Sequence, residues 1–266
     1  AGLARLNNGD PLNTPEEGEL VDERPASAAD RSGTPTLARH SLTLLGQLGA
    51  PGPHATVFRA QTADGGKISV KVYLERYEQV LRDELAILTA VQGHPNVLRC
   101  LGDDMLEDLP PPRPPSYSKH CLKLALAAGG DLFDRAFVSG TPLTIAGLHT
   151  YGVQMVAGVQ HIHSLGIAHL DIKPENFWLD ADGTLMLAEF GLARRMPVNT
   201  IPGGTPQYAA PELTRYSAPL NGYAVDVWAA GVTLLMISIS RNPFALTEFA
   251  PSADGDSHNR PAGRAV

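Results

Sequence analysis

One stretch of eight residues, His169 to Asn176, limits the possible folds of this chain more than any other feature. It reads His-Leu-Asp-Ile-Lys-Pro-Glu-Asn, which brings an acid, a permanent cation and an amide close together. Because Pro174 has no backbone N–H and the polar residues follow no helical period, a loop is predicted here. The apolar segments 148–162 and 177–179 flank this loop. A polar loop between rigid elements is a typical place for catalytic groups.

Length and composition exclude several classes of protein. A chain of 266 residues can bury a sizeable core and form two lobes. Lys and Arg number 21 against 28 Asp and Glu, a net charge of −7, so nucleic acid is not an expected partner. Cys100 and Cys121 are too few for a disulfide framework, and we expect both to be buried free thiols.

No segment of the sequence indicates export or a membrane anchor. Residues 1–10 contain no apolar signal core, and the longest apolar run, residues 227–239, is too short to cross a bilayer core of about 30 Å. We therefore expect a cytoplasmic or nuclear protein with no membrane partner.

Both ends of the chain have the composition of disordered segments. Residues 1–38, rich in Pro, Gly, Ser, Asp and Glu, are predicted to form a disordered leader, and residues 249–266 a disordered tail. Within the predicted folded region, 39–248, the run Pro110–Pro115 should be extended and could dock on an SH3-type groove. A stiff solvated insert between two strands is the favoured interpretation of this run.

The first half of the folded region has the pattern of a sheet with one helix. Strands are expected near five segments, which are 42–45, 55–60, 68–73, 97–101 and 121–126. The turn Asp64-Gly65-Gly66 suits a hairpin, because glycine accepts positive φ. Apolar residues at helical spacing predict a helix over 75–91, which stops at His94-Pro95-Asn96.

The second half is mostly helical in pattern. Apolar residues recur at three- and four-residue steps over 148–162, which predicts a long helix with one buried face. Residues 177–187 predict a short hairpin around a turn at 180–183. Residues 226–239 are apolar nearly all round, so this helix is expected to be buried.

The loop at 169–176 resembles the catalytic loop of the eukaryotic protein kinases, whose pattern is H-R-D-x-K-x-x-N. The chain keeps His169, Asp171, Lys173 and Asn176, and has Leu170 in place of the arginine. That arginine clamps an activation-segment phosphate in many relatives, so switching by phosphorylation is not expected here.

Other kinase motifs follow in the family's order across residues 42–246. Ile-Ser-Val-Lys at 68–71 resembles V-A-I-K, and Gly-Thr-Pro-Gln-Tyr-Ala-Ala-Pro-Glu at 204–212 resembles the end of the activation segment. Asp-Val-Trp-Ala-Ala-Gly-Val at 226–232 is similar to the helix beneath the catalytic loop. Asp226 is expected to bind backbone N–H groups there, since a buried acid needs partners. The order of the motifs strengthens the resemblance.

The resemblance implies an α+β, bilobal kinase-like fold. The N-lobe (39–124) would be an antiparallel sheet plus one helix, followed by a hinge at 125–131 and a mostly helical C-lobe at 132–248. The family continues with several more helices, whereas only a polar tail follows Asn242-Pro243-Phe244. The C-lobe is therefore expected to lack its last helices, either because the chain is a fragment or because this is a minimal lobe with an exposed underside.

The resemblance also implies a serine/threonine protein kinase that uses ATP and Mg²⁺ on a protein substrate. Asp171 would orient the substrate hydroxyl and Lys173 would neutralise the γ-phosphate. Thr205 would bond to both of them. Lys71 would hold the α- and β-phosphates, with Glu84 as its partner on the helix.

The nucleotide site implied by the resemblance draws on several segments. Backbone groups of Ala125 and Ala127 would pair with adenine, and Asp131 would meet the ribose. The remaining expected contacts are Gly52, Val57, Ser69, Lys71 and Leu124. The glycine-rich loop is eroded, because prolines 51 and 53 lack the N–H groups that bind phosphate.

The metal would be held by Asn176 and by Glu189, which stands where the family has the aspartate of D-F-G. Magnesium requires near-octahedral geometry with bonds of about 2.0–2.1 Å, so the longer glutamate arm must fold back. A displacement of about 1 Å can cost on the order of 100-fold in rate.

Two functions remain open from the sequence. Intact Lys71, Asp171, Lys173 and Asn176 favour an active kinase. Glu189, the eroded glycine loop and the absent helices favour a pseudokinase that binds nucleotide or acts as a scaffold. We favour the enzyme, because every chemical role has a residue that can fill it.

Overall fold

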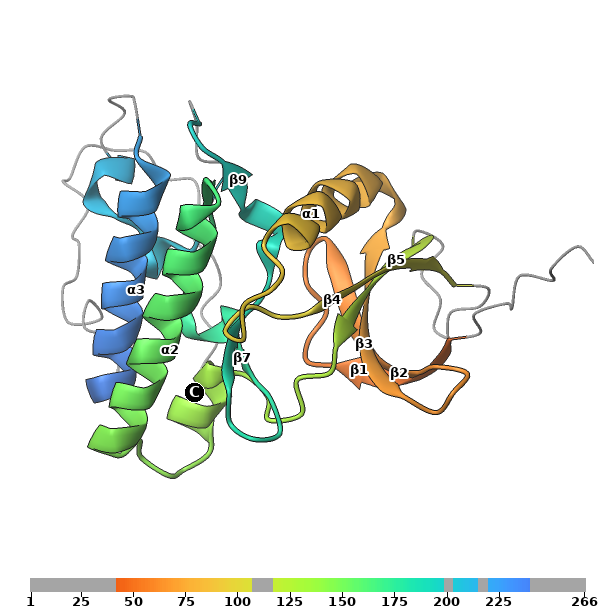
Figure 1. The fold of residues 1–266 in the computed structure, drawn as a ribbon, viewed down its shortest axis with the longest axis horizontal. Coiled ribbons are helices and arrows are strands. Elements are labelled where there is room, and N and C mark those ends of the chain that lie inside the picture. Colours follow the sequence, from red (N-terminus) through yellow and green to blue (C-terminus); the bar gives the residue numbers. More distant parts are fainter. Residues whose placement is uncertain (1–41, 107–116, 199–202, 215–219, 240–266) are drawn as a thin grey trace, which may run out of the picture. The chain divides into compact units, whose positions relative to one another are not determined.

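The computed structural model describes residues 42–106, 117–198, 203–214 and 220–239 (Figure 1). The expected leader 1–38, the expected tail 249–266 and the run Pro110–Pro115 lie outside the described residues, as do residues 242–244.

Alternating apolar residues build a five-stranded antiparallel sheet in the N-lobe. Its strands are β1 (Thr43–Leu48), β2 (Ala55–Gln61), β3 (Lys67–Leu74), β4 (Cys100–Met105) and β5 (Tyr117–Ala125), in the order β1-β2-β3-β5-β4. The central strand β3 sends Val70 and Val72 into one apolar cluster, whereas Tyr73 joins the larger cluster on the other side of the sheet. This alternation also directs Lys71 toward the side of Tyr73.

The strand predicted over 97–101 is wrong in its position. β4 begins only at Cys100, because the preceding residues pair with another part of the chain. Val97 forms a parallel bridge with Leu187, and the Leu98 N–H donates to the Leu187 carbonyl at 2.9 Å. Residues 97–98 thus tie the N-lobe to the C-lobe instead of extending the sheet.

The helix predicted over 75–91 is shorter than expected. A 3₁₀ turn (Glu75–Tyr77) precedes α1 (Glu78–Ala90), so Glu75 lies outside the helix. The face of α1 that packs against β4 and β5 buries three apolar side chains and one acid, namely Leu81, Ile87, Leu88 and Glu84. An acid on a buried helix face requires a partner, which lies on β3.

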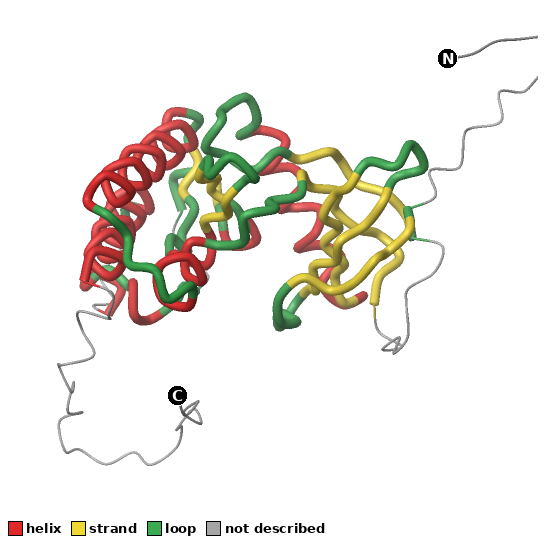
Figure 2. The backbone as a smooth tube through the Cα atoms, turned by 90° about the horizontal axis from the view of Figure 1, so that it is seen from below, coloured by secondary structure: helices red, strands yellow, loops and turns green. Residues whose placement is uncertain are grey.

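Two long helices build the C-lobe and pack against each other: α2 (Ile145–Ser164) and α3 (Gly222–Ile239). Thr144 caps α2, because its hydroxyl accepts a hydrogen bond from the Gly147 N–H at 3.0 Å. Figure 2 shows the strands of the sheet gathered apart from these helices.

Short strands and helical turns lie between the longer elements along the chain. The strands are β6 (Ile167–Ala168), β7 (Phe177–Leu179), β8 (Leu185–Leu187) and β9 (Arg194–Arg195), paired as β6-β9 and β7-β8. The helical turns are Asp134–Val138, Pro174–Asn176, Phe190–Leu192, Pro206–Tyr208 and Pro211–Thr214. The predicted hairpin over 177–187 is confirmed as β7 and β8.

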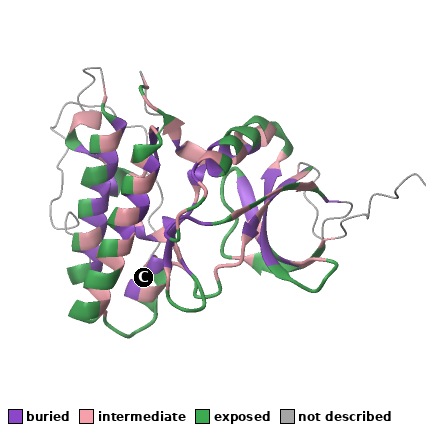
Figure 3. Ribbon diagram, in the orientation of Figure 1, coloured by how far each residue is buried: buried purple, intermediate pink, exposed green. Residues whose placement is uncertain are grey.

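The helix that was expected to be buried over 226–239 is buried on one face only. Figure 3 shows that buried and exposed residues alternate along this helix. Val227, Trp228 and Leu235 are 62%, 42% and 46% exposed. The helix begins at Gly222, so by length and composition alone it could cross a membrane. Half of it is buried by packing and it carries the fully buried Asp226, which is the behaviour of a core helix.

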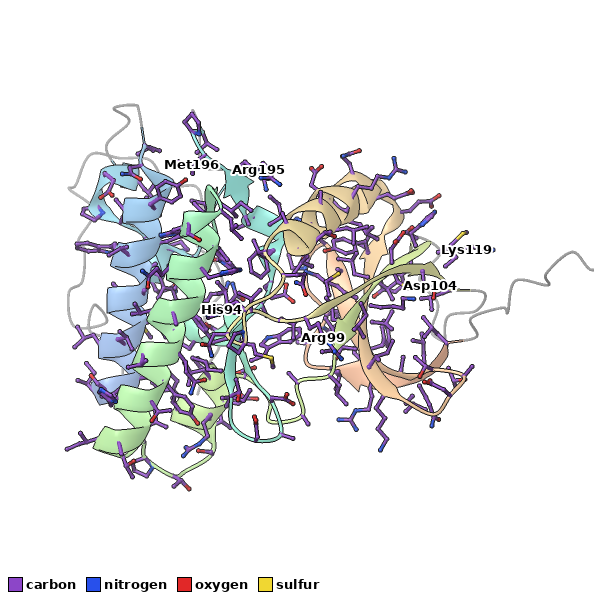
Figure 4. All side chains as sticks on the ribbon, in the orientation of Figure 1. His94, Arg99, Asp104, Lys119, Arg195 and Met196 are labelled. Carbon is purple, nitrogen blue, oxygen red and sulfur yellow. The ribbon has the colours of Figure 1, made fainter. Side chains whose placement is uncertain are left out.

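The turn after α1, which carries His94, fixes the N-lobe to α2 (Figure 4). Asn96 Nδ2 donates to the Leu185 carbonyl at 2.7 Å and to Gln154 Oε1 at 3.1 Å. The Asn96 carbonyl accepts from the Leu187 N–H at 2.9 Å. Gly158 on α2 permits this contact, since a Cβ there would lie 2.6 Å from the Asn96 carbonyl oxygen.

The close approach at Gly158 predicts that Gly158→Ala lowers the free energy of unfolding by about 2 kcal/mol, because overpacking outweighs the gain in helix propensity. Gly152→Ala on the same helix is the matched control. Its methyl would meet only the tip of the Leu234 side chain, at 3.4 Å. We expect this control to be neutral or stabilising by up to about 1 kcal/mol. Urea unfolding of both variants tests the contact, and equal midpoints would contradict it.

Candidate active site

A cavity of about 610 Å³ opens between the two lobes. Its lining comes from the β1–β2 turn, from β2 and β3, and from segments of the C-lobe. The predicted site residues in this lining are Gly52, Val57, Ser69, Lys71, Ala127, Asp131, Lys173, Asn176 and Glu189. Residues predicted from separate parts of the sequence therefore face one space.

Lys71 lies on β3 at the back of the cavity, 6% exposed, between two carboxylates. Its Nζ lies 2.9 Å from both oxygens of Glu84 on α1 and 2.9 Å from Glu189 Oε2. Burial alone would lower the pKa of the Lys71 ammonium, but the charges of Glu189 and Glu84 outweigh burial and hold the pKa well above its ordinary value. Lys71 is therefore a fixed cation.

Glu189 reaches Lys71 from an unusual backbone conformation. Among the described residues, only Leu170 and Glu189 are non-glycine residues with positive φ, at 67° and 63°. This conformation is costly for a residue with a Cβ, and it persists where the surroundings impose it. Glu189, in the Glu-Phe-Gly segment, lines the cavity, whereas Leu170, in the catalytic-loop segment, is buried in the core.

Asp171 is the centre of a second polar group. Thr205 Oγ1 donates to Asp171 Oδ1 at 2.8 Å, and Lys173 Nζ lies 2.8 Å from both Asp171 Oδ2 and Thr205 Oγ1. Asn176 Nδ2 donates to Asp171 Oδ2 at 3.0 Å and to the Asp171 carbonyl at 2.7 Å. The catalytic loop and the activation segment are thus connected through one carboxylate.

Opposing effects act on the pKa of the Asp171 carboxyl. Burial raises this pKa, but the hydrogen bond and charge of Lys173 and the hydrogen bonds from Thr205 and Asn176 together lower it below its ordinary value. Asp171 is therefore an ionised carboxylate at neutral pH.

Asp226 on α3 supports the catalytic loop from below, as expected. Its two carboxylate oxygens accept the N–H groups of His169 at 2.6 Å and Leu170 at 2.7 Å, and His163 Nε2 lies 2.9 Å from it. Asp226 is fully buried, so these contacts satisfy a charge that would otherwise be very costly. They also hold Leu170 in its positive-φ conformation.

Two predicted nucleotide contacts in the hinge region are not part of the cavity lining. Leu124 is 2% exposed and belongs to the apolar core. The Ala125 N–H donates to the Arg99 carbonyl at 2.9 Å, so this donor is already used within the N-lobe (Arg99 is labelled in Figure 4). Of the backbone groups of Ala125 that were expected to pair with adenine, the N–H therefore already has a partner.

Two other predicted contacts line the cavity but already have an internal partner. The Gly52 N–H donates to the Ala55 carbonyl at 2.9 Å, so it is not free to bind phosphate. One oxygen of Asp131 accepts the Asp134 N–H at 2.8 Å. Burial raises the pKa of the Asp131 carboxyl.

Sequence reasoning missed several residues at the site. Glu175 and Trp178 line the cavity, and one buried Glu175 oxygen has no hydrogen-bond partner among the residues that the structure describes. Tyr73 does not line the cavity, but its hydroxyl donates to Glu84 Oε2. The signal for Tyr73 was available, since it lies two residues after Lys71 on a strand and therefore on the same face.

The donor set of the cavity is compatible with magnesium. Within the described ranges there is no group of three or more His, Cys, Asp or Glu that could hold a metal alone. Asn176 and Glu189 both line the cavity, and the Asn176 amide nitrogen is taken up by Asp171, which leaves its oxygen as the ligand atom. Mg²⁺ is usually bound by one or two such oxygen ligands together with substrate phosphates.

Comparison with known proteins agrees with this geometry. Myosin light chain kinase, smooth muscle, from Gallus gallus is 32% identical over 202 residues, which cover 73% of this chain and 10% of the relative. CBL-interacting protein kinase 4 from Oryza sativa subsp. japonica is 33% identical over 241 residues, 84% of this chain and 49% of the relative. Calcium/calmodulin-dependent protein kinase type 1B from Homo sapiens is 35% identical over 179 residues, which cover 65% of this chain and 48% of the relative.

The chain therefore spans less than half the length of each of these relatives. The family model described as protein kinase domain matches residues 42–259. This match confirms the expected α+β fold with an N-lobe sheet and a helical C-lobe. The chain belongs to the protein kinase family.

Proposed function

We propose that this chain is a serine/threonine protein kinase that transfers the γ-phosphate of ATP to a serine or threonine hydroxyl of a protein. The observation that carries the proposal is that Lys71, paired with Glu84, and Lys173, paired with Asp171 and Thr205, line the same cavity. The names of the relatives support a protein substrate. Lysine two residues after Asp171 supports Ser/Thr specificity through the family resemblance.

Two cations of the chain would stabilise the transferred phosphate. Lys71 would bind the α- and β-phosphates at the back of the cavity, and Lys173 would meet the γ-phosphate near Asp171. In the transfer, the substrate hydroxyl oxygen forms a bond to the γ-phosphorus of ATP, and the bond between that phosphorus and the β,γ-bridging oxygen breaks. ADP leaves, and the hydroxyl proton is released. Fixed cations suit this reaction, because its charge develops on phosphate oxygens.

Asp171 would orient the substrate hydroxyl. Its lowered pKa makes it a weak base, so it accepts a hydrogen bond from the hydroxyl and receives the proton only late in the transfer. Thr205 and Asn176 hold the carboxylate in place from two sides.

Magnesium, when bound, would neutralise charge on the phosphates and orient them. Asn176 and Glu189 are the residues of this chain that would hold it. Because Glu189 Oε2 is paired with Lys71, its second oxygen is the one available as a ligand without breaking that pair.

A pseudokinase is the second candidate, and two observations favour it. The carboxylate of Glu189 is paired with Lys71. One of its two oxygens is therefore occupied by the ammonium group and is not available to a metal ion. The Gly52 N–H, already bonded within the β1–β2 turn, removes one phosphate donor as well.

Glu189→Asp is expected to raise the rate of phosphotransfer by about tenfold or more, because the shorter arm restores the usual position of the metal ligand. The rate is measured with radiolabelled ATP and a mixture of serine- and threonine-containing peptides. Glu75→Asp, an exposed residue outside the cavity, is the matched control and should leave the rate unchanged. If neither the wild type nor Glu189→Asp transfers phosphate while both bind ATP, the pseudokinase is supported.

Asp171→Ala is expected to lower phosphotransfer by about 100-fold or more, because the hydroxyl loses its acceptor. Nucleotide affinity should persist, since Lys71 and Glu189 are untouched. The control is the melting temperature in Mg²⁺–ATP, where ligand at about 100 times its Kd adds about 2.7 kcal/mol to stability. An equal loss of ATP binding in Asp171→Ala would argue against this division of roles.

A further inference from the structure

A buried tyrosine lies beside the ion pair of the cavity without lining the cavity itself. Tyr73 is 1% exposed on β3, two residues after Lys71, and belongs to the apolar cluster that includes α1. Both side chains are therefore on the face of the sheet that α1 covers.

Tyr73 contacts both members of the ion pair. Its hydroxyl donates to Glu84 Oε2, and the centroid of its ring lies 5.3 Å from Lys71 Nζ. Burial raises the pKa of the Tyr73 phenol well above its ordinary value, the Lys71 charge opposes this rise, and the Glu84 charge adds to it. The phenol therefore stays protonated and remains a donor.

The balance of charges shows why a second donor is useful at Glu84. Two carboxylates, Glu84 and Glu189, share the single ammonium of Lys71, so the group carries an excess negative charge. Glu84 is 2% exposed and has no access to bulk water that could solvate this excess. The Tyr73 hydroxyl supplies a hydrogen bond to the buried carboxylate without changing the number of charges.

We propose that Tyr73 is a positioning residue that anchors Glu84, and with it α1, independently of Lys71. The proposal rests on the proposed function, in which Lys71 also has to hold nucleotide phosphates. When the Lys71 ammonium group donates a hydrogen bond to a phosphate oxygen, its hydrogen bonds to Glu84 become weaker or fewer. The Tyr73 hydroxyl then keeps the carboxylate and the helix in place.

Tyr73→Phe isolates this role, because it removes the hydroxyl and keeps the ring beside Lys71. The matched control is Tyr117→Phe, on β5 of the same sheet, which removes the 2.6 Å hydrogen bond between Tyr117 and Thr56. Both variants lose one hydroxyl in the N-lobe, but only the first touches Glu84.

The first test is amide hydrogen exchange of the nucleotide-free protein. A hydrogen bond to a charged group is strong enough that Tyr73→Phe should speed exchange across α1 by about tenfold or more. Exchange across α2 should not change, and Tyr117→Phe should leave α1 as in the wild type. Equal exchange in α1 for both variants, or a uniform increase over the whole N-lobe, would overturn the proposal in favour of simple packing.

A second test uses Glu84→Met, which removes the acceptor at similar side-chain length. If Tyr73 acts through Glu84, Tyr73→Phe has no further effect on α1 exchange in this background, or slows it by removing an unpaired hydroxyl. Additive effects of the two substitutions would count against the coupling.

Binding and turnover separate this proposal from the proposed function. Tyr73→Phe should weaken Mg²⁺–ATP binding several-fold, seen as a higher KM for ATP with a smaller change in kcat. A wild type that transfers no phosphate, with α1 exchange still dependent on Tyr73, refutes the kinase activity and supports the anchor. A wild type that transfers phosphate, with Tyr73→Phe identical to Tyr117→Phe in every readout, refutes only the anchor.

Discussion

The structure depends on one buried ammonium group. Lys71 connects the central strand of the sheet to α1 through Glu84, and to the C-lobe through Glu189. Removing one partner of a buried ion pair typically costs about 3–5 kcal/mol, because the other charge stays buried. Few other contacts could therefore hold three separate segments around a cavity so firmly. The same ammonium is the group that would meet the nucleotide, so the stability of the fold and the proposed chemistry share one residue.

A second buried charge, Asp226, does for the C-lobe what Lys71 does for the N-lobe. It accepts hydrogen bonds from the backbone N–H groups of His169 and Leu170, and so fixes the position of the backbone that leads into Asp171. The turn at Asn96 then joins the two lobes through its backbone carbonyl and through its buried side-chain amide. The cavity between the lobes is therefore bounded by β3, which is fixed to α1, and by the catalytic loop, which is fixed to α3.

The sequence predicted the parts of the site that depend on residue identity. The resemblance of the motifs to those of the protein kinases identified Lys71, Asp171, Lys173 and Asn176. The run after the Asp64-Gly65-Gly66 turn indicated the strand β3, which is buried on both faces. Local patterns could not show that the Ala125 N–H is used by the Arg99 carbonyl, since that contact joins segments 26 residues apart (125 − 99). Nor could they show the shift of β4, which follows from the bridge between Val97 and Leu187.

Helix burial was the other weak point of the sequence analysis. An all-round apolar pattern indicates a buried helix, but α3 exposes Val227 and Trp228. The sequence pattern shows which faces of the helix are apolar. It does not show whether another part of the chain packs against each face. Tyr73 was overlooked for a similar reason, because an aromatic residue in a strand is most often only part of the core.

The position of Lys71 between two carboxylates has a consequence for covalent inhibitors. Reagents that acylate or sulfonylate lysine react with the neutral amine, and the raised pKa of Lys71 keeps that form scarce near neutrality. An electrophile placed in the cavity would therefore label Lys71 slowly for as long as Glu189 stays paired with it. A warhead that first draws Glu189 away from the ammonium would gain both space and a better nucleophile.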